Sequence, residues 1–515
     1  MASFAQERLF LDEKFRFSDQ IAIYNEMMVL RVSQGGLSIN RFQAALRFIL
    51  SKHKILRTSL GFNSDDGTLR QSITDSHQTF TLALGQSYRN DDELCKIVHQ
   101  LMIDPHLFDL STGRVFHCEI LRQEHNMNDE NELKESDVIV MVFHHAANDR
   151  TSRQVFHTDL SMAYNDHLTT AMNEEAFEYI DYSIHERLID MTVSRDFWKS
   201  EVEGYNRENS LLLPGDRHHS VADQRSGLAF FGHISFADEV TAQFLKYASI
   251  HEVTPFQLGL AIFYAFVFKF THDRNDLCIA CLNANRYRNE LQNMIGMFVT
   301  TSPYRIRLDS QWTLETLVQH VREKSLAILE HAHYPLQHMH VNSSVEQSHA
   351  LFLEVVFDFI TLSSHTSHLS FNGAQLEPIS PEKSDEVAKF DVMLRFLYNP
   401  ADDNGKLFCR LICSRDLFDE PTVAIMTRRF EHLVSQLFSS ASPANETEKS
   451  LIPISKLSLI LPEEVQEIQR TNFHRQTNIV QEGMSITELF WTISNSRCGL
   501  SVSQTPKPLF YHCGL

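Results

Sequence analysis

The hydrophobic and polar positions of this chain follow two periods, that of a helix and that of a strand. Apolar residues at helical spacing predict helices over residues 42–56, 151–165 and 256–270. Continuous apolar runs of strand length predict strands at 137–143, 277–282, 298–306, 352–359, 390–397 and 407–413. Because both element types interleave in each half, the pattern predicts an α/β chain of two lobes.

A further helix is predicted after residue 419. Asp419 is placed to cap it, and Pro421 suits its first turn, where a missing N–H costs nothing. Its apolar face is spaced at helical intervals: Met426, Phe430, Leu433, Val434 and Leu437. Between roughly 174 and 225 the pattern loosens. We therefore expect the crossover between the two halves there.

Composition narrows the class of partner. The chain has 515 residues, 66 of them acidic and 46 of them Lys or Arg, which gives a net charge of −20. Nucleic acids and anionic membranes attract basic surfaces, so neither is an expected partner. The first residues lack the pattern of a secretory signal, and the apolar stretch 256–270 is shorter than the roughly 20 residues that span a bilayer. These features predict a cytoplasmic protein.

Two groups of potential metal ligands have structural explanations. Cys278 and Cys281 have CxxC spacing, but apolar neighbours and the lack of a matching second pair favour a core strand. Four histidines crowd one segment, with no carboxylate spaced to join them: His331, His333, His338 and His340. We expect no bound metal and free thiols.

One cluster combines a titratable base with a carboxylate at a structural junction. His144, His145 and Asp149 follow the apolar run 137–143 and precede the helix 151–165. An imidazole has a near-neutral pKa and can accept and pass on a proton. Asp149 could pair with a buried arginine and hold the loop. On spacing alone, two loop histidines and a helix-capping aspartate are the favoured explanation of the pattern.

The segment from His144 to Asp149 resembles the HHxxxDG motif of the condensation domains of nonribosomal peptide synthetases, which belong to the chloramphenicol acetyltransferase superfamily. Further segments resemble other motifs of that family, in the same order along the chain: Ser3 to Leu9, Lys52 to Thr58, Leu107 to Leu110, Asn285 to Arg286, Ile295 to Thr301, His333 to Leu336 and Lys389 to Asp391. Several ordered matches over about 440 residues are much more specific than one motif.

The resemblance implies two acyltransferase-like lobes, 1–180 and 181–440, forming a V with an active-site tunnel between them. Donor and acceptor carrier proteins would act in trans, each with its own 4'-phosphopantetheine, so that no cofactor is bound by this chain. The acceptor amine would attack a thioester to form an amide.

The resemblance also assigns roles to residues. His145 would be the catalytic histidine, acting as a general base or by stabilising the tetrahedral intermediate, with His144 and Asp149 as supports. Arg57 and Arg286 are both candidates to pair with Asp149.

Two positions depart from the family pattern. Arg150 stands where the family has Gly, and Thr300 where it has Asn. A long cationic side chain at 150 could narrow the acceptor channel or change its charge, or it could point outward with its stem on the surface. The resemblance therefore implies an acyltransferase whose activity depends on the placement of Arg150.

The C-terminal part resembles a linker over 441–480 and, over 481–515, the start of an adenylation domain that does not continue. Other synthetase modules would then supply both substrates. Two alternatives stay open: an impaired condensation domain that docks carriers as a scaffold, motivated by Arg150, and an acyl-CoA-dependent acyltransferase. Plant-type members of the latter class carry a DFGWG segment, which this chain lacks.

Overall fold

The computed structural model describes residues 1–75, 80–124, 131–165, 177–205, 215–217, 224–339, 354–362, 369–379, 387–400, 405–439 and 452–471. The chain forms two compact units, Met1–Leu459 and Ile460–Leu515. In the second unit, residues 462–471 are helical. The expected adenylation-like segment 481–515 and half of the expected linker 441–480, namely residues 441–451 and 472–480, lie outside the described residues.

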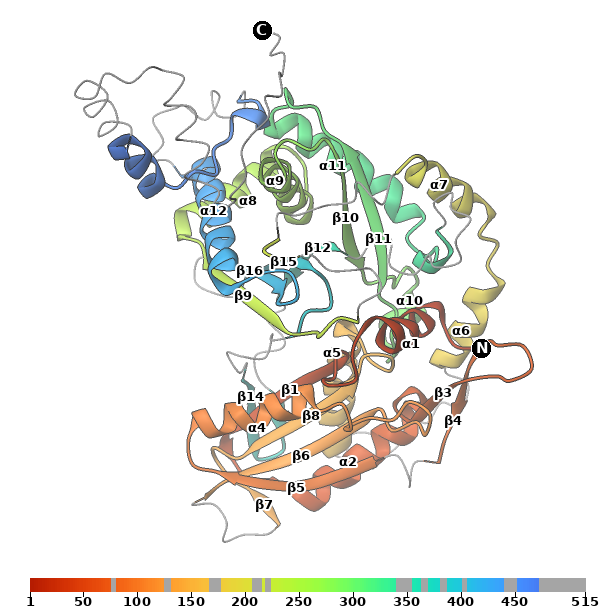
Figure 1. Cartoon of the computed structure of the whole chain (residues 1–515). Coiled ribbons are helices and arrows are strands. Elements are labelled where there is room, and N and C mark those ends of the chain that lie inside the picture. Colours follow the sequence, from red (N-terminus) through yellow and green to blue (C-terminus); the bar gives the residue numbers. More distant parts are fainter. Residues whose placement is uncertain are drawn as a thin grey trace, which may run out of the picture. The chain divides into compact units, whose positions relative to one another are not determined.

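A six-stranded sheet forms the first lobe of the first unit (Figure 1). Its strand order is β13 (Leu369–Phe371), β14 (Ala374–Pro378), β1 (Asn25–Gly35), β8 (Val138–His144), β6 (Phe116–Gln123) and β5 (Phe80–Tyr88). Helices α2 (Ile39–Lys52) and α5 (Arg150–Tyr164) pack on one face, and α4 (Asp91–Ile103) packs on the other. Because both faces are covered, every residue of β8 is buried, which explains its continuous apolar run.

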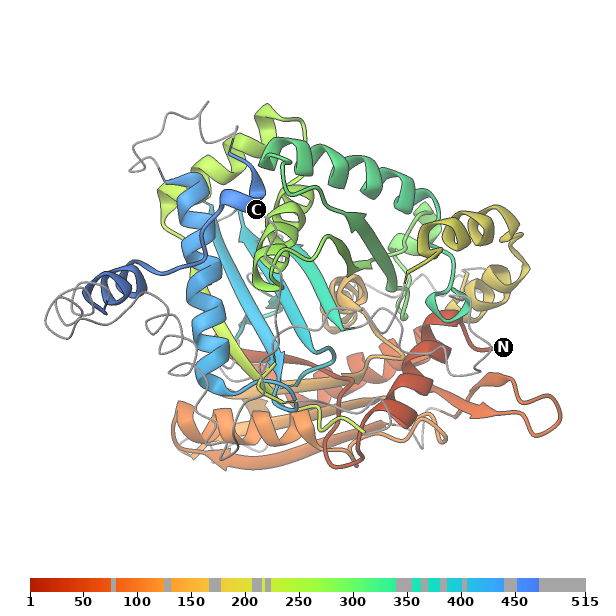
Figure 2. The ribbon, with the colours of Figure 1, turned by 45° about the horizontal axis from the view of Figure 1, so that its top comes forward.

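A second six-stranded sheet forms the other lobe. Its order is β11 (Thr300–Arg307), β10 (Asp276–Asn283), β12 (Val355–Thr361), β15 (Val392–Asn399), β16 (Lys406–Ser414) and β9 (Ala229–Ser235). One face packs against α8 (Asp238–Ile250), α9 (Pro255–Phe270), α11 (Leu314–Glu330) and α12 (Glu420–Phe438). In Figure 2, α12 lies in front of the strands of this sheet. Helix α9 is buried nearly all round, which accounts for its uniformly apolar sequence.

Shorter elements connect and flank the sheets. They are α1 (Phe4–Arg16), β2 (Leu37–Ser38), η1 (Lys54–Arg57), β3 (Thr58–Phe62), β4 (Leu69–Ile73), β7 (Glu132–Leu133), α6 (Tyr179–Leu188), α7 (Thr192–Val202), α10 (Asn289–Gln292), η4 (Leu336–His338) and η6 (Ile454–Lys456). The prediction of an α/β chain with two lobes is confirmed.

The predicted elements are present, and the differences lie at their ends. The helix predicted over 42–56 ends at Lys52, and its last residues form the 3-10 turn η1. The strand predicted from residue 298 begins at Thr300. The backbone N–H of Phe298 donates to the carboxylate of Asp149, so Phe298 lies at the junction of the lobes and not in the strand. Periodicity does not detect such a contact, because it reports only local geometry.

Asp419 occupies the N-cap position of α12, as predicted, but its side chain does not cap the helix. Its carboxylate forms an ion pair with Arg217 instead. Asp216 supports this helix start, accepting from the backbone N–H of Asp419 at 2.7 Å and from the hydroxyl of Thr422 at 2.9 Å.

A hairpin from the second half of the chain belongs to the first sheet. Strand β14 pairs antiparallel with β1, and β13 pairs with β14. Residues 1–180, the first expected lobe, therefore supply all strands of the first sheet except this hairpin. Residues 181–440, the second expected lobe, supply the hairpin and the whole second sheet. By pairing with β1, the hairpin covers what would otherwise be the open edge of the sheet.

No single helix among the described residues is long and apolar enough to cross a membrane. The pair α8 and α9 meets the test together but is bent by 108°.

Candidate active site

The carboxylate of Asp149 joins the two lobes. Its Oδ1 atom accepts from the backbone N–H of Ser152 at 2.8 Å, which caps α5, and from Nη2 of Arg286 at 2.8 Å. Its Oδ2 atom accepts from the N–H of Phe298 at 3.3 Å. Both partners of the ion pair are almost fully buried. A buried carboxylate is stabilised only by such charge-assisted bonds, so this contact fixes the loop 144–149 against the second half of the chain.

The structure selects one of the two arginines considered for Asp149. Arg286 makes the ion pair, and its guanidinium also stacks on the ring of Phe298 at 4.2 Å. Arg57 does not reach Asp149. Its Nε and Nη1 atoms donate to the carbonyls of Leu50 and Thr74, because η1 directs its side chain toward the end of β4.

His144 is a buried support rather than a cavity residue. Its Nδ1 atom accepts from the backbone N–H of Ala146 at 3.1 Å, and its Nε2 atom lies 3.1 Å from the carboxylate of Glu13. Both ring nitrogens are thus engaged, which holds the turn after β8 in place.

His145 lies at the end of β8 and lines a cavity between the two lobes. Its backbone N–H donates to the carbonyl of Tyr24 at 2.8 Å. Its Nδ1 atom is 2.7 Å from the carbonyl of Asn148, a geometry that places the ring proton on Nδ1. The Nε2 atom is left as the basic nitrogen, 3.6 Å from the carboxylate of Glu26.

Burial lowers the pKa of His145 to about 4, even though the neighbouring carboxylate of Glu26 acts in the opposite direction. Lys389 and Arg153 add to the lowering. The imidazole is therefore neutral at physiological pH, which is the form that can accept a proton.

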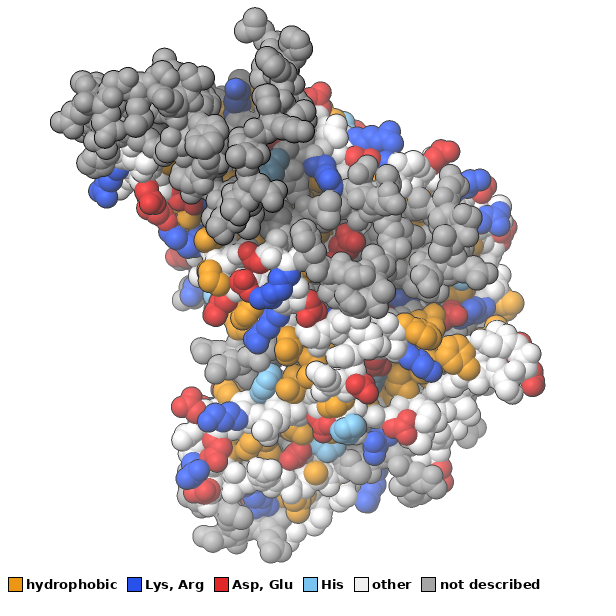
Figure 3. All heavy atoms as spheres, viewed as in Figure 1, with side chains coloured by type: hydrophobic (Ala, Val, Ile, Leu, Met, Phe, Trp, Pro, Cys, Tyr) orange, Lys and Arg blue, Asp and Glu red, His pale blue; other side chains and the backbone are white. Residues whose placement is uncertain are grey.

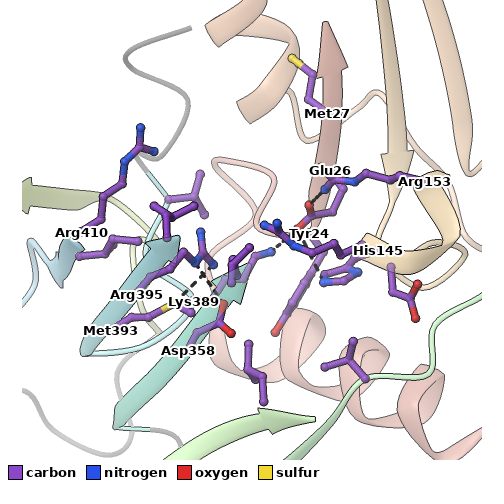
Figure 4. Close-up of a pocket in the computed structure, with 18 of the residues that line it drawn as sticks. Tyr24, Glu26, Met27, His145, Arg153, Asp358, Lys389, Met393, Arg395 and Arg410 are labelled. Atoms are coloured by element: carbon purple, nitrogen blue, oxygen red, sulfur yellow. Dashed lines mark hydrogen bonds and ion pairs between the residues drawn. The ribbon is translucent and has the colours of Figure 1, made fainter. Parts of the chain in front are cut away.

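A three-residue ion cluster beside His145 was not predicted from the sequence (Figure 4). Glu26 at the start of β1 is paired with Nζ of Lys389 at 2.7 Å and with Arg153. Burial alone would raise the pKa of Glu26, but Lys389 and Arg153 hold it well below its usual range. Two features of the sequence could have pointed to this cluster. Lys389 lies in a motif-like segment, and Glu26 is a lone charge before the apolar stretch of β1.

The cavity has a volume of about 890 Å3 and is lined from both sheets. Arg150 lines it from the first turn of α5. Arg150 is exposed, although much protein lies around its guanidinium, and this burial together with the charge of Arg395 lowers its pKa to about 10. Of the two placements considered for Arg150, the structure shows the one inside the cavity.

The groups considered as metal ligands are structural where they are described. The two cysteines Cys278 and Cys281 lie in β10 and are buried, and burial raises the pKa of both thiols. His331 and His333 share the hydroxyl of Ser194, at 3.0 and 3.1 Å. Within the described residues no group of three or more His, Cys, Asp or Glu is arranged for a metal ion. His340 lies outside them.

The low pKa of His145 makes a testable prediction about pH. Its imidazole should stay neutral down to about pH 4, whereas an ordinary histidine protonates near pH 6.5. The unfolded chain then binds a proton that the folded chain does not, so this contribution to stability is present above about pH 6.5 and lost as the pH falls through about 4. NMR titration of 13C-labelled histidine, assigned with His145→Asn, measures it.

Lys389→Met should raise the pKa of His145, because the ammonium group disfavours a second positive charge beside it. A native His145 resonance that titrates near 6.5 would contradict this account of its environment.

Comparison with known proteins gives consistent matches over the same region. Residues 1–460 match the family model "Condensation domain". Gramicidin S synthase 2 of Brevibacillus brevis is 23% identical over 468 residues, 90% of this chain and 10% of that protein. The chain spans about a tenth of the length of the curated relatives that it matches first.

Solved structures show the same fold. The X-domain from teicoplanin biosynthesis has a TM-score of 0.71 and 20% identity, over 89% of this chain and 97% of that one. The condensation domain from Monacolin K polyketide synthase has a TM-score of 0.68 and 16% identity, over 85% of this chain and 97% of that one.

Proposed function

This chain belongs to the condensation-domain family of nonribosomal peptide synthetases, and from that premise we propose that it forms an amide between a carrier-bound acyl thioester and a carrier-bound amino acid. Its lobes have the chloramphenicol acetyltransferase-like fold of the family. The observation that carries the proposal is the neutral His145, whose Nε2 atom is the basic nitrogen at a cavity lined from both lobes.

In the proposed reaction the amine nitrogen of the acceptor attacks the thioester carbonyl carbon and the C–S bond breaks. The arm of the donor carrier leaves as a thiol, taking up the proton that the amine loses. Nε2 of His145 takes a proton from the attacking amine, or donates a hydrogen bond after protonation to stabilise the tetrahedral intermediate. The bond between Nδ1 and the Asn148 carbonyl holds the ring in one orientation for either role. Asp149 and Arg286 act on the reaction only through the position of this loop.

The phosphopantetheine arms would be supplied on donor and acceptor carriers in trans, from other synthetase modules. A cavity of about 890 Å3 with polar and apolar lining from both sheets has room for the thioester end of such an arm. Along the outer face in Figure 3, acidic and basic side chains of the described residues are interspersed. An acidic carrier protein would be repelled by the overall negative charge of this chain. Carrier docking would therefore depend on local contacts.

The proposal is tested by mixing the full chain with acyl-loaded and aminoacyl-loaded carriers and measuring amide product by mass spectrometry. We expect product only when both loaded carriers are present. Replacing the donor carrier with the corresponding acyl-CoA is the matched control, and product from acyl-CoA but not from the carrier would favour the acyl-CoA-dependent alternative.

An impaired condensation domain that docks carriers is the second candidate, and the position of Arg150 inside the cavity favours it. The X-domain among the similar structures is recorded in complex with OxyB from teicoplanin biosynthesis. This alternative predicts carrier binding without product in the native chain and a gain of product in Arg150→Gly, where the cavity is widened. Product formation by the native chain would contradict it.

A further inference from the structure

A row of polar side chains crosses the second sheet on the face that lines the cavity. Asp358 of β12, Arg395 of β15, Arg410 of β16 and His233 of β9 are directly opposite one another in the strand register. All four line the cavity. Directly opposed residues on neighbouring strands hold their side chains on the same face about 5 Å apart, so the four side chains form one continuous row.

The row interrupts an otherwise apolar wall. Positions two residues away on the same strands point to the same face and also line the cavity, and they are apolar: Met393, Leu397, Phe408 and Ile412. The two arginines of the row are partly exposed rather than withdrawn from water. They place charged groups on a cavity wall that is otherwise apolar.

The row carries more positive than negative charge. Arg395 is paired with Asp358 at 3.2 Å, which is the one carboxylate in the row. Arg410 adds a further positive charge beside this pair, whereas burial and the charge of Arg410 lower the pKa of His233 and keep it neutral. The row thus contains two guanidinium groups and one carboxylate.

Arg150 adds a third guanidinium group to the same cavity. It lines the cavity from α5 in the first lobe, and the charges of Arg395 and Asp358 both act on it. Figure 4 shows Arg395 and Arg410 on the wall opposite His145. Among the described residues that line the cavity, six are Lys or Arg and four are Asp or Glu, although the whole chain has a net charge of −20.

We infer that Arg410, Arg395 and Arg150 form an anion-binding subsite in the cavity, which receives a carboxylate or phosphate carried by the substrate. The inference rests on the proposed function for the identity of that substrate. Guanidinium groups bind both anions through paired N–H donors, and Met393 and Ile412 beside the row accommodate an alkyl chain that ends in the anion. The anion could be a carboxylate on the acyl or aminoacyl group or the phosphate of the phosphopantetheine arm.

Binding of small probes tests the subsite without requiring turnover. We would measure, by calorimetry on the full chain, the affinities of succinyl-pantetheine and its terminal amide, and of phosphopantetheine and pantetheine. We expect the anionic member of at least one pair to bind about tenfold more tightly than its neutral partner. A charge-assisted hydrogen bond to a guanidinium accounts for a difference of this size. A preference in the first pair identifies a substrate carboxylate, and one in the second pair identifies the phosphate.

Arg410→Gln and Arg150→Gln should each reduce that preference to less than about threefold, and Arg410→Lys should retain part of it. Arg89→Gln, on an exposed turn and paired with Glu93, is the matched control and should leave the preference unchanged. Circular dichroism of each variant verifies folding. The subsite is wrong if neither anion is preferred, or if the preference survives both substitutions. Failure of amide formation with neutral substrates would instead contradict the proposed function, because the binding assay does not depend on it.

Discussion

Replacing His145 with alanine should reduce amide formation by about 10²- to 10⁴-fold, the usual contribution of a positioned general acid or base. The residue lies at a cavity wall with its side chain 18% exposed, so its removal leaves no large unfilled volume. Glu26 is a poor substitute for its basic Nε2 atom, because Lys389 and Arg153 hold the pKa of Glu26 well below its usual range and so make its carboxylate a weak base. The rate should be measured with both loaded carriers.

The matched control is His106→Ala. His106 is exposed on a turn outside the cavity, so this variant should form product at the native rate. Thermal unfolding of both variants should stay close to that of the native chain. Product formation by His145→Ala within about twofold of the native rate would remove His145 from the mechanism.

The largest effect on stability is expected at the ion pair of Asp149 and Arg286. Asp149→Ala should lower the free energy of unfolding by about 3–5 kcal/mol, because it leaves a buried guanidinium without its charge partner. It also removes the cap of α5 and the acceptor for the N–H of Phe298. Urea-induced unfolding followed by circular dichroism measures the change.

Two variants separate the buried pair from a general loss of charge. Asp149→Ala combined with Arg286→Met should cost less than Asp149→Ala alone, since no unpaired charge is then buried. Asp66→Ala, which breaks an exposed ion pair with Arg70, should leave the free energy of unfolding almost unchanged. A loss below about 1 kcal/mol in Asp149→Ala would show that the buried pair does not hold the junction of the lobes.

The sequence predicts His145 as the central residue of a site, and the structure places other charged residues around it on the cavity wall. The sequence placed His145 at a strand end, and in the structure it directly follows β8. It did not indicate the contact between Glu26 and Lys389, which are 363 residues apart and meet only through the packing of the two lobes. An ion pair between residues so far apart in the sequence leaves no periodic or spacing pattern, although Glu26 and Lys389 both help to set the pKa of His145.

The sequence by itself determined the elements and the motif order. Strand and helix periods follow from the local geometry of the backbone, so the apolar runs located β8, β10 and α9 without knowledge of their neighbours. The position of the histidines at a strand end followed for the same reason.

Only the tertiary structure decided which groups meet. It chose Arg286 over Arg57 for Asp149, placed the hairpin β13–β14 in the first sheet, and directed Arg150 into the cavity. It also aligned Arg395 and Arg410 in one register row. These outcomes depend on contacts between surfaces distant in sequence, whose free energies are set by shape and charge across the folded lobes rather than by any local pattern.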